Sequence, residues 1–457
     1  MKTKSGFYRQ IAVLVIPIVL QNLLSAAVNS ADVVMLNFVG QAEISAVSLA
    51  AQFANILHMV FYGLGTGVTM LCAQYYGKGD QRAINVVQGI AMRFSIVISV
   101  LFAAAAVFVP KLMMLIYTPD PELIELGAEY LRIMSIAYLC WGVSEVYLAT
   151  LRSVGRVAVS TALNTFAFTL NIILNAVFIF GLFGAPQLGL VGVAIGTSTS
   201  RLLELVLCFI VSAKSKDVKL KFSYMFLKSK ALLGDFLKMA GPALINDIVW
   251  GVGFSMYSVI IGHFLGSDAV AANALAGVVR SYGTILCFGV ASAGGILLGQ
   301  IIGENDMAGA EEAGKKIVKL TVITGAIGGV IILAAMPLIL RFADLNETGL
   351  SYLRTMLFIN SYYVMGAAVN TTLIAGVFRA GGDSRFGMIC DFIDMWIYAV
   401  PLGFIAAALL KLPPMWVYFL LCTDEFVKWP WVIKRYKSRK WLKNITRDDL
   451  FEDTAKA

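Results

Sequence analysis

The chain has 457 residues, of which 59% are hydrophobic and 14% are charged. A soluble domain is usually about 45–50% apolar and about 25% charged, so this composition excludes a typical soluble enzyme, a disordered chain and a small disulfide scaffold. The net charge is +8. The basic residues sit in short loops between apolar runs, which is typical of a membrane protein and not of a nucleic-acid-binding surface.

Twelve apolar segments are long enough to cross a bilayer, for which about 20 residues are needed. In chain order they are 10–36, 44–75, 84–109, 126–150, 158–183, 189–212, 234–264, 269–301, 316–340, 350–377, 386–409 and 414–433. Continuous runs of this length exclude a β-barrel, which needs alternating segments of about ten residues. The sequence therefore predicts an all-α polytopic membrane protein.

The charges of the loops predict the orientation of these segments. Lys and Arg concentrate in the loops that follow even-numbered segments, for example Lys78, Arg82, Arg152 and Arg156. The N-terminal MKTKSGFYR and the C-terminal KRYKSRKWLK share that side, which the positive-inside rule makes cytoplasmic. Both termini are therefore expected in the cytoplasm. No small-residue cleavage site follows the first segment, so we expect it to be retained as a span.

The second half of the chain repeats the first at an offset of about 225 residues, as in Pro17 and Pro242. AQYYGKGD (73–80) matches GQIIGEND (299–306), and LRSVG (151–155) matches FRAGG (378–382). Each half holds six segments, so both halves have the same orientation, as in transporters built from parallel repeats. We predict an N-terminal six-helix lobe (1–212), a basic cytoplasmic linker (213–233), a C-terminal six-helix lobe (234–440) and a cytoplasmic tail (441–457).

Three stretches make the chain resemble the multidrug and toxic compound extrusion (MATE) family of bacterial exporters. They are PIVLQNLLSAAVNSADVVMLNFVG (17–40), LNIILNAVFIFGLFGAPQLGLVGVAIGTSTSR (170–201) and FRAGGDSRFGMICDFIDMWIYAVPLGF (378–404). The resemblance implies a V-shaped pair of pseudo-symmetric six-helix bundles in a bacterial inner membrane. It also implies export of amphipathic organic cations in exchange for protons or sodium ions, by alternating access. The wider superfamily contains flippases, so export of lipid-linked sugars or polar metabolites stays open as an alternative.

Three residues are candidates for coupling transport to an ion. Asp32 lies near the outer end of the first segment, where a carboxylate is costly and would pack differently when protonated. The resemblance places the coupling aspartate here; the alternative is a helix cap. Asn171 and Asn175 are one helical turn apart and could hold Asp32 or supply carbonyls to sodium, or else serve as packing contacts. Ala368 stands where sodium-coupled relatives of the NorM type carry an acid, which favours protons.

Several intramembrane residues are candidates for binding substrate. Asp247 lies near the middle of its segment, and could either face a cationic substrate or form a structural ion pair with Arg280. Asp391 could recruit cations from the cytoplasm, whereas Asp394 is expected to cap a helix or pair with Arg385. Polar or adaptable side chains that could line a binding cleft are Gln21, Asn22, Met256, Tyr257, Arg280 and Tyr282. Two local pairs, Arg201 with Glu204 and Glu425 with Lys428, are expected to be structural.

The sequence offers no catalytic or nucleotide-binding motif. It contains no HExxH, no GxSxG and no Walker A pattern. Its six cysteines lie inside apolar segments without a CxxC pair, so we expect no disulfide framework and no metal site. We therefore predict a monomeric transporter that is not an enzyme and uses no cofactor, with small organic cations and the lipid bilayer as its partners and no nucleic acid.

Overall fold

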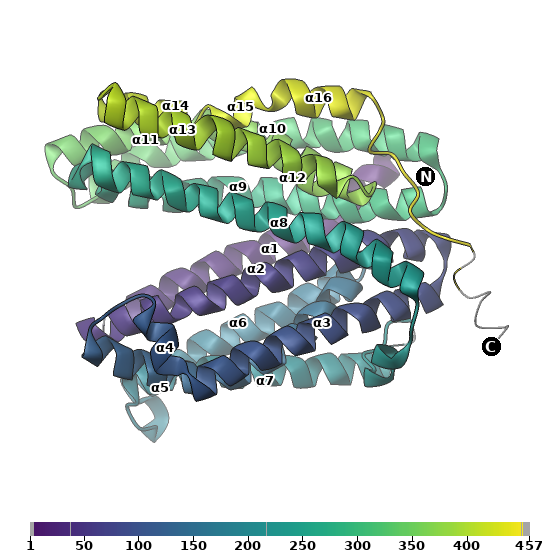
Figure 1. The fold of residues 1–457 in the computed structure, drawn as a ribbon, viewed down its shortest axis with the longest axis horizontal. Helices are drawn as coiled ribbons and strands as arrows, with labels where there is room; N and C mark the ends of the chain where they lie inside the picture. The colour runs from purple at the N-terminus through teal and green to yellow at the C-terminus, as the bar shows by residue number, and fades with distance from the viewer. Residues whose placement is uncertain (1–3, 37, 216, 449, 451–457) are drawn as a thin grey trace. The chain divides into compact units, whose positions relative to one another are not determined.

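The computed structural model describes residues 4–36, 38–215, 217–448 and 450, and these residues form helices with no strand among them (Figure 1). The long helices are α1 (Lys4–Leu36), α2 (Gln41–Lys78), α3 (Gln81–Phe108), α5 (Pro121–Ser153), α6 (Val157–Phe180), α7 (Gly189–Lys214), α8 (Lys230–Ile260), α9 (Ser267–Gly303), α10 (Met307–Phe342) and α11 (Glu347–Thr371). The short α4 (Pro110–Leu115) and the turns η1 (Leu182–Gly184) and η2 (Phe222–Phe226) lie in connections.

The last part of the chain is more broken. The π-helical turns η3 (Ile261–Leu265) and η4 (Thr372–Phe378) extend α8 and α11. The eleventh predicted span consists of α12 (Ser384–Phe392), η5 (Ile393–Ala399), α13 (Val400–Phe404) and η6 (Ile405–Leu409). Within the described chain, eleven helices are long and apolar enough to cross a membrane. The predicted span 414–433 is instead divided among α14 (Pro414–Leu421), α15 (Asp424–Val427) and α16 (Trp429–Lys437).

The chain forms two compact units. Unit 1 comprises Met1–Val19 and Gly241–Thr446, and unit 2 comprises Leu20–Ala240 and Arg447–Ala457. The division passes through α1 and α8, because each of these long helices contributes to both units. Each unit is described by itself below.

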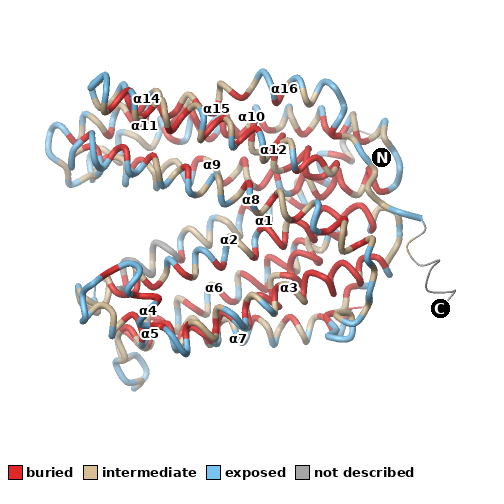
Figure 2. The backbone as a smooth tube through the Cα atoms, in the orientation of Figure 1, coloured by how far each residue is buried: buried red, intermediate tan, exposed pale blue. Residues whose placement is uncertain are grey.

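Unit 2 is built around α5, which packs against α2, α3 and α7. Small residues allow these helices to approach closely: a Cβ added at Gly142 of α5 would lie 2.4 Å or less from the hydroxyls of Ser95 and Ser99 on α3. Close contact through small residues is typical of helices that associate in lipid. Figure 2 shows exposed residues scattered along most of the other helices, as expected of surfaces that face lipid.

In unit 1, α9, α10 and α11 all pack against one another. A Cβ at Gly328 of α10 would lie 2.5 Å from the carbonyl oxygen of Gly283 on α9, and one at Gly329 would lie 2.3 Å from the carbonyl oxygen of Ser361 on α11. The first part of α1 belongs to this unit: Val19 packs on Gly289, and the Lys316 ammonium lies 5.1 Å from the Phe7 ring centroid.

The predicted repeat is visible as repeated local structure. Asp80 caps α3 by accepting from the Ala83 backbone N–H at 2.9 Å, and Asp306 caps α10 by accepting from Gly309 at 2.8 Å. A residue with positive φ precedes each cap, Gly79 at 81° and Asn305 at 63°. In the second matched pair, Gly155 and Gly382 have φ of 80° and 76°. These are left-handed conformations that glycine adopts without strain, so the matched motifs end their helices in the same way.

Candidate functional site

The two asparagines predicted on one face of α6 do meet, and a threonine of α7 joins them. Asn171 Nδ2 donates to Thr197 Oγ1 at 3.0 Å, and Asn175 Nδ2 lies 3.4 Å from Asn171 Oδ1. Both asparagines are buried. The approach of α7 depends on Gly196, where an added Cβ would lie 2.4 Å from Asn175 Oδ1. Sequence reasoning missed Thr197, whose only signal was its place beside that glycine.

Asp32, the predicted coupling carboxylate, lies in α1 within unit 2. Its side chain falls outside the described part of the structure, so its predicted contact with Asn171 and Asn175 stays a prediction. Gln21 and Asn22, on the same helix, are partly buried. Thr161 Oγ1 donates to Gln21 Oε1 at 3.4 Å, which ties α1 to α6 inside unit 2.

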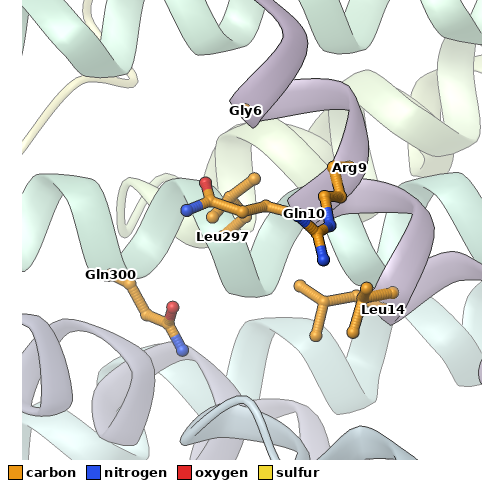
Figure 3. A pocket seen from close by; sticks show the side chains of 7 residues that line it. Gly6, Arg9, Gln10, Leu14, Leu297 and Gln300 are labelled. Carbon is orange, nitrogen blue, oxygen red and sulfur yellow. The ribbon is translucent and has the colours of Figure 1, made fainter. Parts of the chain in front are cut away.

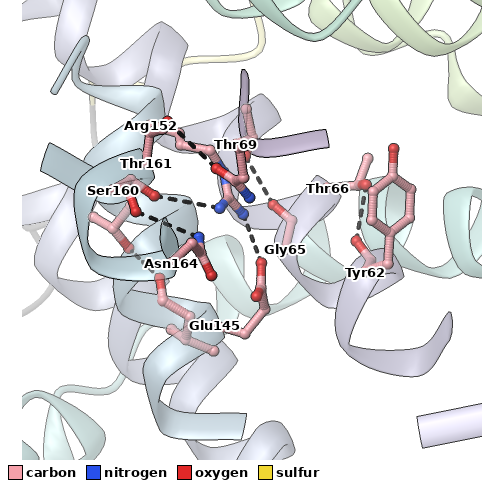
Figure 4. A network of polar contacts seen from close by, with 12 residues as sticks. Tyr62, Gly65, Thr66, Thr69, Glu145, Arg152, Ser160, Thr161 and Asn164 are labelled. Atoms are coloured by element: carbon pink, nitrogen blue, oxygen red, sulfur yellow. Dashed lines mark hydrogen bonds and ion pairs between the residues drawn. The ribbon is translucent and has the colours of Figure 1, made fainter. Parts of the chain in front are cut away.

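A polar network continues from Thr161 toward α5 (Figure 4). Arg152 Nη2 donates to Glu145 Oε1 at 2.6 Å and Arg152 Nη1 to Ser160 Oγ at 3.4 Å, while Asn164 donates to the Ser160 carbonyl at 3.4 Å. Figure 4 shows the Arg152 side chain lying between Glu145 and Ser160. The network neutralises the Glu145 carboxylate within the helices of unit 2.

The predicted local pair of Arg201 and Glu204 is present, at 2.9 Å, with the Glu204 side chain fully buried. The Arg201 guanidinium also lies 4.6 Å from the centroid of the Trp141 ring, a cation–π distance. His58 packs beside Trp141, with ring centroids 5.5 Å apart. Arg152 and Arg201 of unit 2 are thus each paired with a glutamate.

In unit 1 the structure corrects the predicted partner of Asp247. Asp247 Oδ1 accepts from Arg379 Nη2 at 2.8 Å, so the alternative pair with Arg280 was wrong. Arg280 instead lies 5.2 Å from the centroid of the Phe254 ring and 5.5 Å from that of Tyr363. Aromatic faces attract a guanidinium through their quadrupole, which gives Arg280 a partner without a carboxylate.

The second correction concerns Asp394, which does not pair with Arg385. It lies with Asp391, Asp424, Glu425 and Lys428 in a buried group that we call the acid–lysine cluster. The Lys428 ammonium nitrogen is 3.1 Å from Asp391, 3.4 Å from Asp394 and 3.2 Å from Glu425. The expected Glu425–Lys428 pair is thus one part of a larger cluster that sequence spacing did not reveal.

The remaining candidates of unit 1 have different surroundings. Tyr257 is buried, and its hydroxyl donates to Asp424 Oδ2 at 2.9 Å. Met256 packs against the hydrophobic core of unit 1, whereas Tyr282 is 39% exposed. Of these three candidates, Tyr257 is the one that reaches the acid–lysine cluster.

A pocket of about 530 Å³ opens between α1 and α9 in unit 1 (Figure 3). The residues that line it are Gly6, Arg9, Gln10, Val13, Leu14, Leu297 and Gln300. Its wall is mainly apolar with two amides and one guanidinium. Arg9 gives this pocket a positive charge, which suits an anionic or neutral group better than a cation.

Comparison with known proteins identifies the family. The family model named MatE matches residues 17–177 and 242–405, which is more than half of the chain. The chain belongs to the MatE family. The resemblance seen in the sequence is therefore confirmed, and each matched range lies within one of the two predicted lobes.

Curated relatives of this MATE transporter include several bacterial proteins. It is 25% identical over 440 residues to the uncharacterized transporter YisQ of Bacillus subtilis, which covers 93% of each chain. It is 26% identical over 431 residues to the probable multidrug resistance protein YoeA of the same organism, which covers 91% of this chain and 90% of YoeA. It is 23% identical over 450 residues to the probable multidrug resistance protein NorM of Thermotoga maritima (97% and 96%).

Solved structures confirm the fold class. The structure described as a MATE P26A mutant aligns with a TM-score of 0.85 at 18% identity, covering 94% of this chain and 96% of that one. A transporter of the wider MOP superfamily from Pyrococcus furiosus aligns with a TM-score of 0.83 at 18% identity, covering 96% and 100%. The protein is thus an all-α membrane transporter of the MATE fold.

Proposed function

We propose that the protein is a secondary antiporter that expels amphipathic organic cations in exchange for protons, by alternating access between its two helical lobes. The observation that carries this proposal is the buried Asn171–Asn175–Thr197 group, which lies in the same unit as the predicted coupling residue Asp32. Relatives named as probable multidrug resistance proteins, matched over most of their length, support the export of drug-like cations.

Protons suit this group better than sodium ions. Sodium needs several oxygen ligands, and the Thr197 hydroxyl and the Asn171 carbonyl each already use one of their two lone pairs to accept a hydrogen bond within the group. Ala368, at the position of a sodium-site acid in NorM-type relatives, is fully buried and apolar. A carboxylate at Asp32 that gains and loses a proton would supply the two states that coupling requires.

Location and assembly form part of the same proposal. We infer a monomer in a bacterial inner membrane. We also infer that both termini lie in the cytoplasm, because basic side chains gather at the end of α16, as the positive-inside rule predicts for a cytoplasmic end. The proposed activity is transport without chemical conversion of the substrate, and it uses no cofactor and no nucleic acid.

The test is efflux of a fluorescent organic cation from proteoliposomes with the proton and sodium gradients imposed separately. We expect a proton gradient alone to drive efflux and Asp32→Asn to lower the rate at least tenfold. Asp344→Asn makes the same chemical change at an exposed aspartate and should leave the rate unchanged. Efflux by a well-folded Asp32→Asn protein at the rate of the unmodified chain would refute the coupling role.

An alternative is export of lipid-linked sugars or polar metabolites. The Pyrococcus furiosus transporter is described as having a binding pocket of reversed polarity, which suggests a different function for that protein. In this chain Arg152 and Arg201 of unit 2 are each neutralised by a glutamate. Because these positive charges are neutralised, the charge of unit 2 favours cation export. If neither gradient moves the cation in the efflux assay, the alternative is favoured instead.

A further inference from the structure

The acid–lysine cluster of unit 1 holds more negative than positive charge. It contains the single ammonium of Lys428, the three carboxylates that pair with it (Asp391, Asp394 and Glu425), and the carboxylate of Asp424, which accepts from the Glu425 backbone N–H. All five residues are at most 5% exposed. Burying an uncompensated charge is strongly unfavourable, so a group of this composition must acquire further positive charge or lose some of its negative charge.

Neighbouring elements do not supply enough positive charge to balance the four carboxylates. Two arginines lie near the cluster: Arg379, which is paired with Asp247, and Arg280, which rests on aromatic rings. The titratable and charged groups at Asp394 are Tyr257 on α8, Cys390 and Asp391 on α12, and Asp424, Glu425 and Lys428. The groups that reach other members of the cluster are Arg280 on α9, Tyr363 on α11, Arg379 after η4 and Cys422 after α14. Asp247 pairs with Arg379, and Tyr418 lies beside Arg280 and Cys422. Counted together, these groups remain net negative if every carboxylate is ionised.

Three of the carboxylates have a hydrogen-bond donor besides the lysine. Asn246 Nδ2 donates to Asp391 at 2.8 Å, Asn370 Nδ2 to Glu425 at 2.6 Å, and the Tyr257 hydroxyl to Asp424 at 2.9 Å. These donors stabilise the ionised forms of their acceptors.

Asp394 differs from the other three. It is 0% exposed, and among the described residues no group hydrogen-bonds to either of its carboxylate oxygens. Lys428 approaches Oδ2 only as an ion pair at 3.4 Å. A buried carboxylate without donors is the member of the cluster for which a neutral, protonated form costs least.

A metal ion does not suit this place. The Lys428 ammonium already occupies the centre of three carboxylates, where a cation would bind. No three His, Cys, Asp or Glu side chains in the described chain are arranged to hold a metal. The remaining cation of suitable size is a proton bound to a carboxylate oxygen.

A path for that proton lies next to the cluster. A cavity of about 30 Å³ is lined by Tyr257, Arg280 and Tyr418 together with Ser258 and Asn273. This volume exceeds the roughly 10–15 Å³ that one water molecule needs. Ser258 is exposed, while the Tyr257 hydroxyl reaches Asp424 inside the cluster. Water in this cavity would connect the cluster to the surface of unit 1.

We propose that Asp394 is a proton-binding site of unit 1, distinct from Asp32 of unit 2, and that its proton exchanges with water through the cavity beside Tyr257. Binding forms an O–H bond on one Asp394 oxygen while an O–H bond of a hydronium ion breaks and leaves a water molecule. Release reverses this exchange and re-forms the hydronium ion. The site does not depend on the identity of the transported substrate.

The test is a pH titration of the purified protein in detergent, followed by infrared difference spectroscopy of the carboxylic acid C=O stretch. Between pH about 6 and 10, ordinary surface carboxylates with pKa values near 4 stay ionised and contribute nothing. We expect a protonated-carboxyl band that appears on acidification and persists in Asp32→Asn. The double variant Asp32→Asn/Asp394→Asn should lose it, and Asp32→Asn/Asp344→Asn, with an exposed aspartate changed instead, should keep it.

A second variant covers the case in which Asp394→Asn fails to fold. Asp394→Glu keeps the acid and moves it by one methylene, so the frequency of the band should shift. A band that is absent from Asp32→Asn, that survives Asp394→Asn, or that stays at the same frequency in Asp394→Glu would overturn the assignment. Because no substrate is used, failure here is distinguishable from failure of the proposed antiport.

Discussion

Replacing Lys428 with methionine tests how much the ammonium stabilises unit 1. Its nitrogen lies 3.1–3.4 Å from three carboxylates. At an effective dielectric constant of about 20, two unit charges about 3.2 Å apart attract by roughly 5 kcal/mol. Desolvation of the ammonium offsets much of that attraction. Removing one partner of a buried ion pair nevertheless costs about 3–5 kcal/mol, because the other charge is left uncompensated.

The six cysteines provide the assay. All of them are buried and free, so a thiol-reactive fluorogenic dye labels the protein only as it unfolds. For a cooperative unit of about 150–250 residues, each kcal/mol shifts the Tm by about 2–4 °C, so Lys428→Met should lower the apparent Tm by about 10 °C. Lys315→Met is the matched control, because Lys315 is 66% exposed and, within the described part of the chain, pairs only with Glu311 one turn away. It should leave the Tm unchanged.

Acidification should reduce the loss of stability that Lys428→Met causes. Without the ammonium, the carboxylates of the cluster bind protons more readily in the folded state than in the unfolded chain. The free energy of unfolding of the variant therefore rises as pH falls. A Lys428→Met protein that melts with the Lys315→Met control at neutral pH would refute the electrostatic argument.

Two further substitutions test packing. Gly67→Ala places a Cβ 2.5 Å from the Ala240 Cβ and should lower the free energy of unfolding by about 1–3 kcal/mol. The control Gly234→Ala has nothing within 4 Å of its new Cβ and should be neutral or stabilising. Equal Tm values for the two variants would contradict the close approach of α2 and α8. Trp441→Ala removes a buried ring stacked on Tyr436, with ring centroids 5.7 Å apart, and should lower the free energy of unfolding by about 3–5 kcal/mol. Trp416→Ala changes a side chain that is 60% exposed and should lower it much less in the same assay.

The properties that sequence predicted correctly are those that depend on short spacing along one helix. The length and hydrophobicity of the segments predicted an all-α membrane protein, because the bilayer requires every spanning backbone to bond internally. The Arg201–Glu204 pair and the adjacency of Asn171 and Asn175 followed from three- and four-residue spacing.

The tertiary structure decided which side chains on different helices form ion pairs. Asp247 pairs with Arg379, 132 positions away in the chain, and not with Arg280, the alternative partner that the sequence offered. Sequence places Arg280 within segment 269–301 and Arg379 just after segment 350–377, but it does not give the rotation of their helices about their axes. Packing fixes that rotation, and so selects which guanidinium meets the carboxylate.

The acid–lysine cluster shows the same limit most clearly. Its members come from α12, η5 and α15 and from Lys428, which directly precedes α16. The break of the final predicted span brings them together. In sequence Asp391 and Asp394 are two acids on one helix, and Glu425 and Lys428 are one ion pair. Only the fold brings one ammonium within 3.4 Å of three carboxylates and places Asp424 beside them. Burial makes this grouping matter, because it removes the water that would otherwise solvate each charge separately.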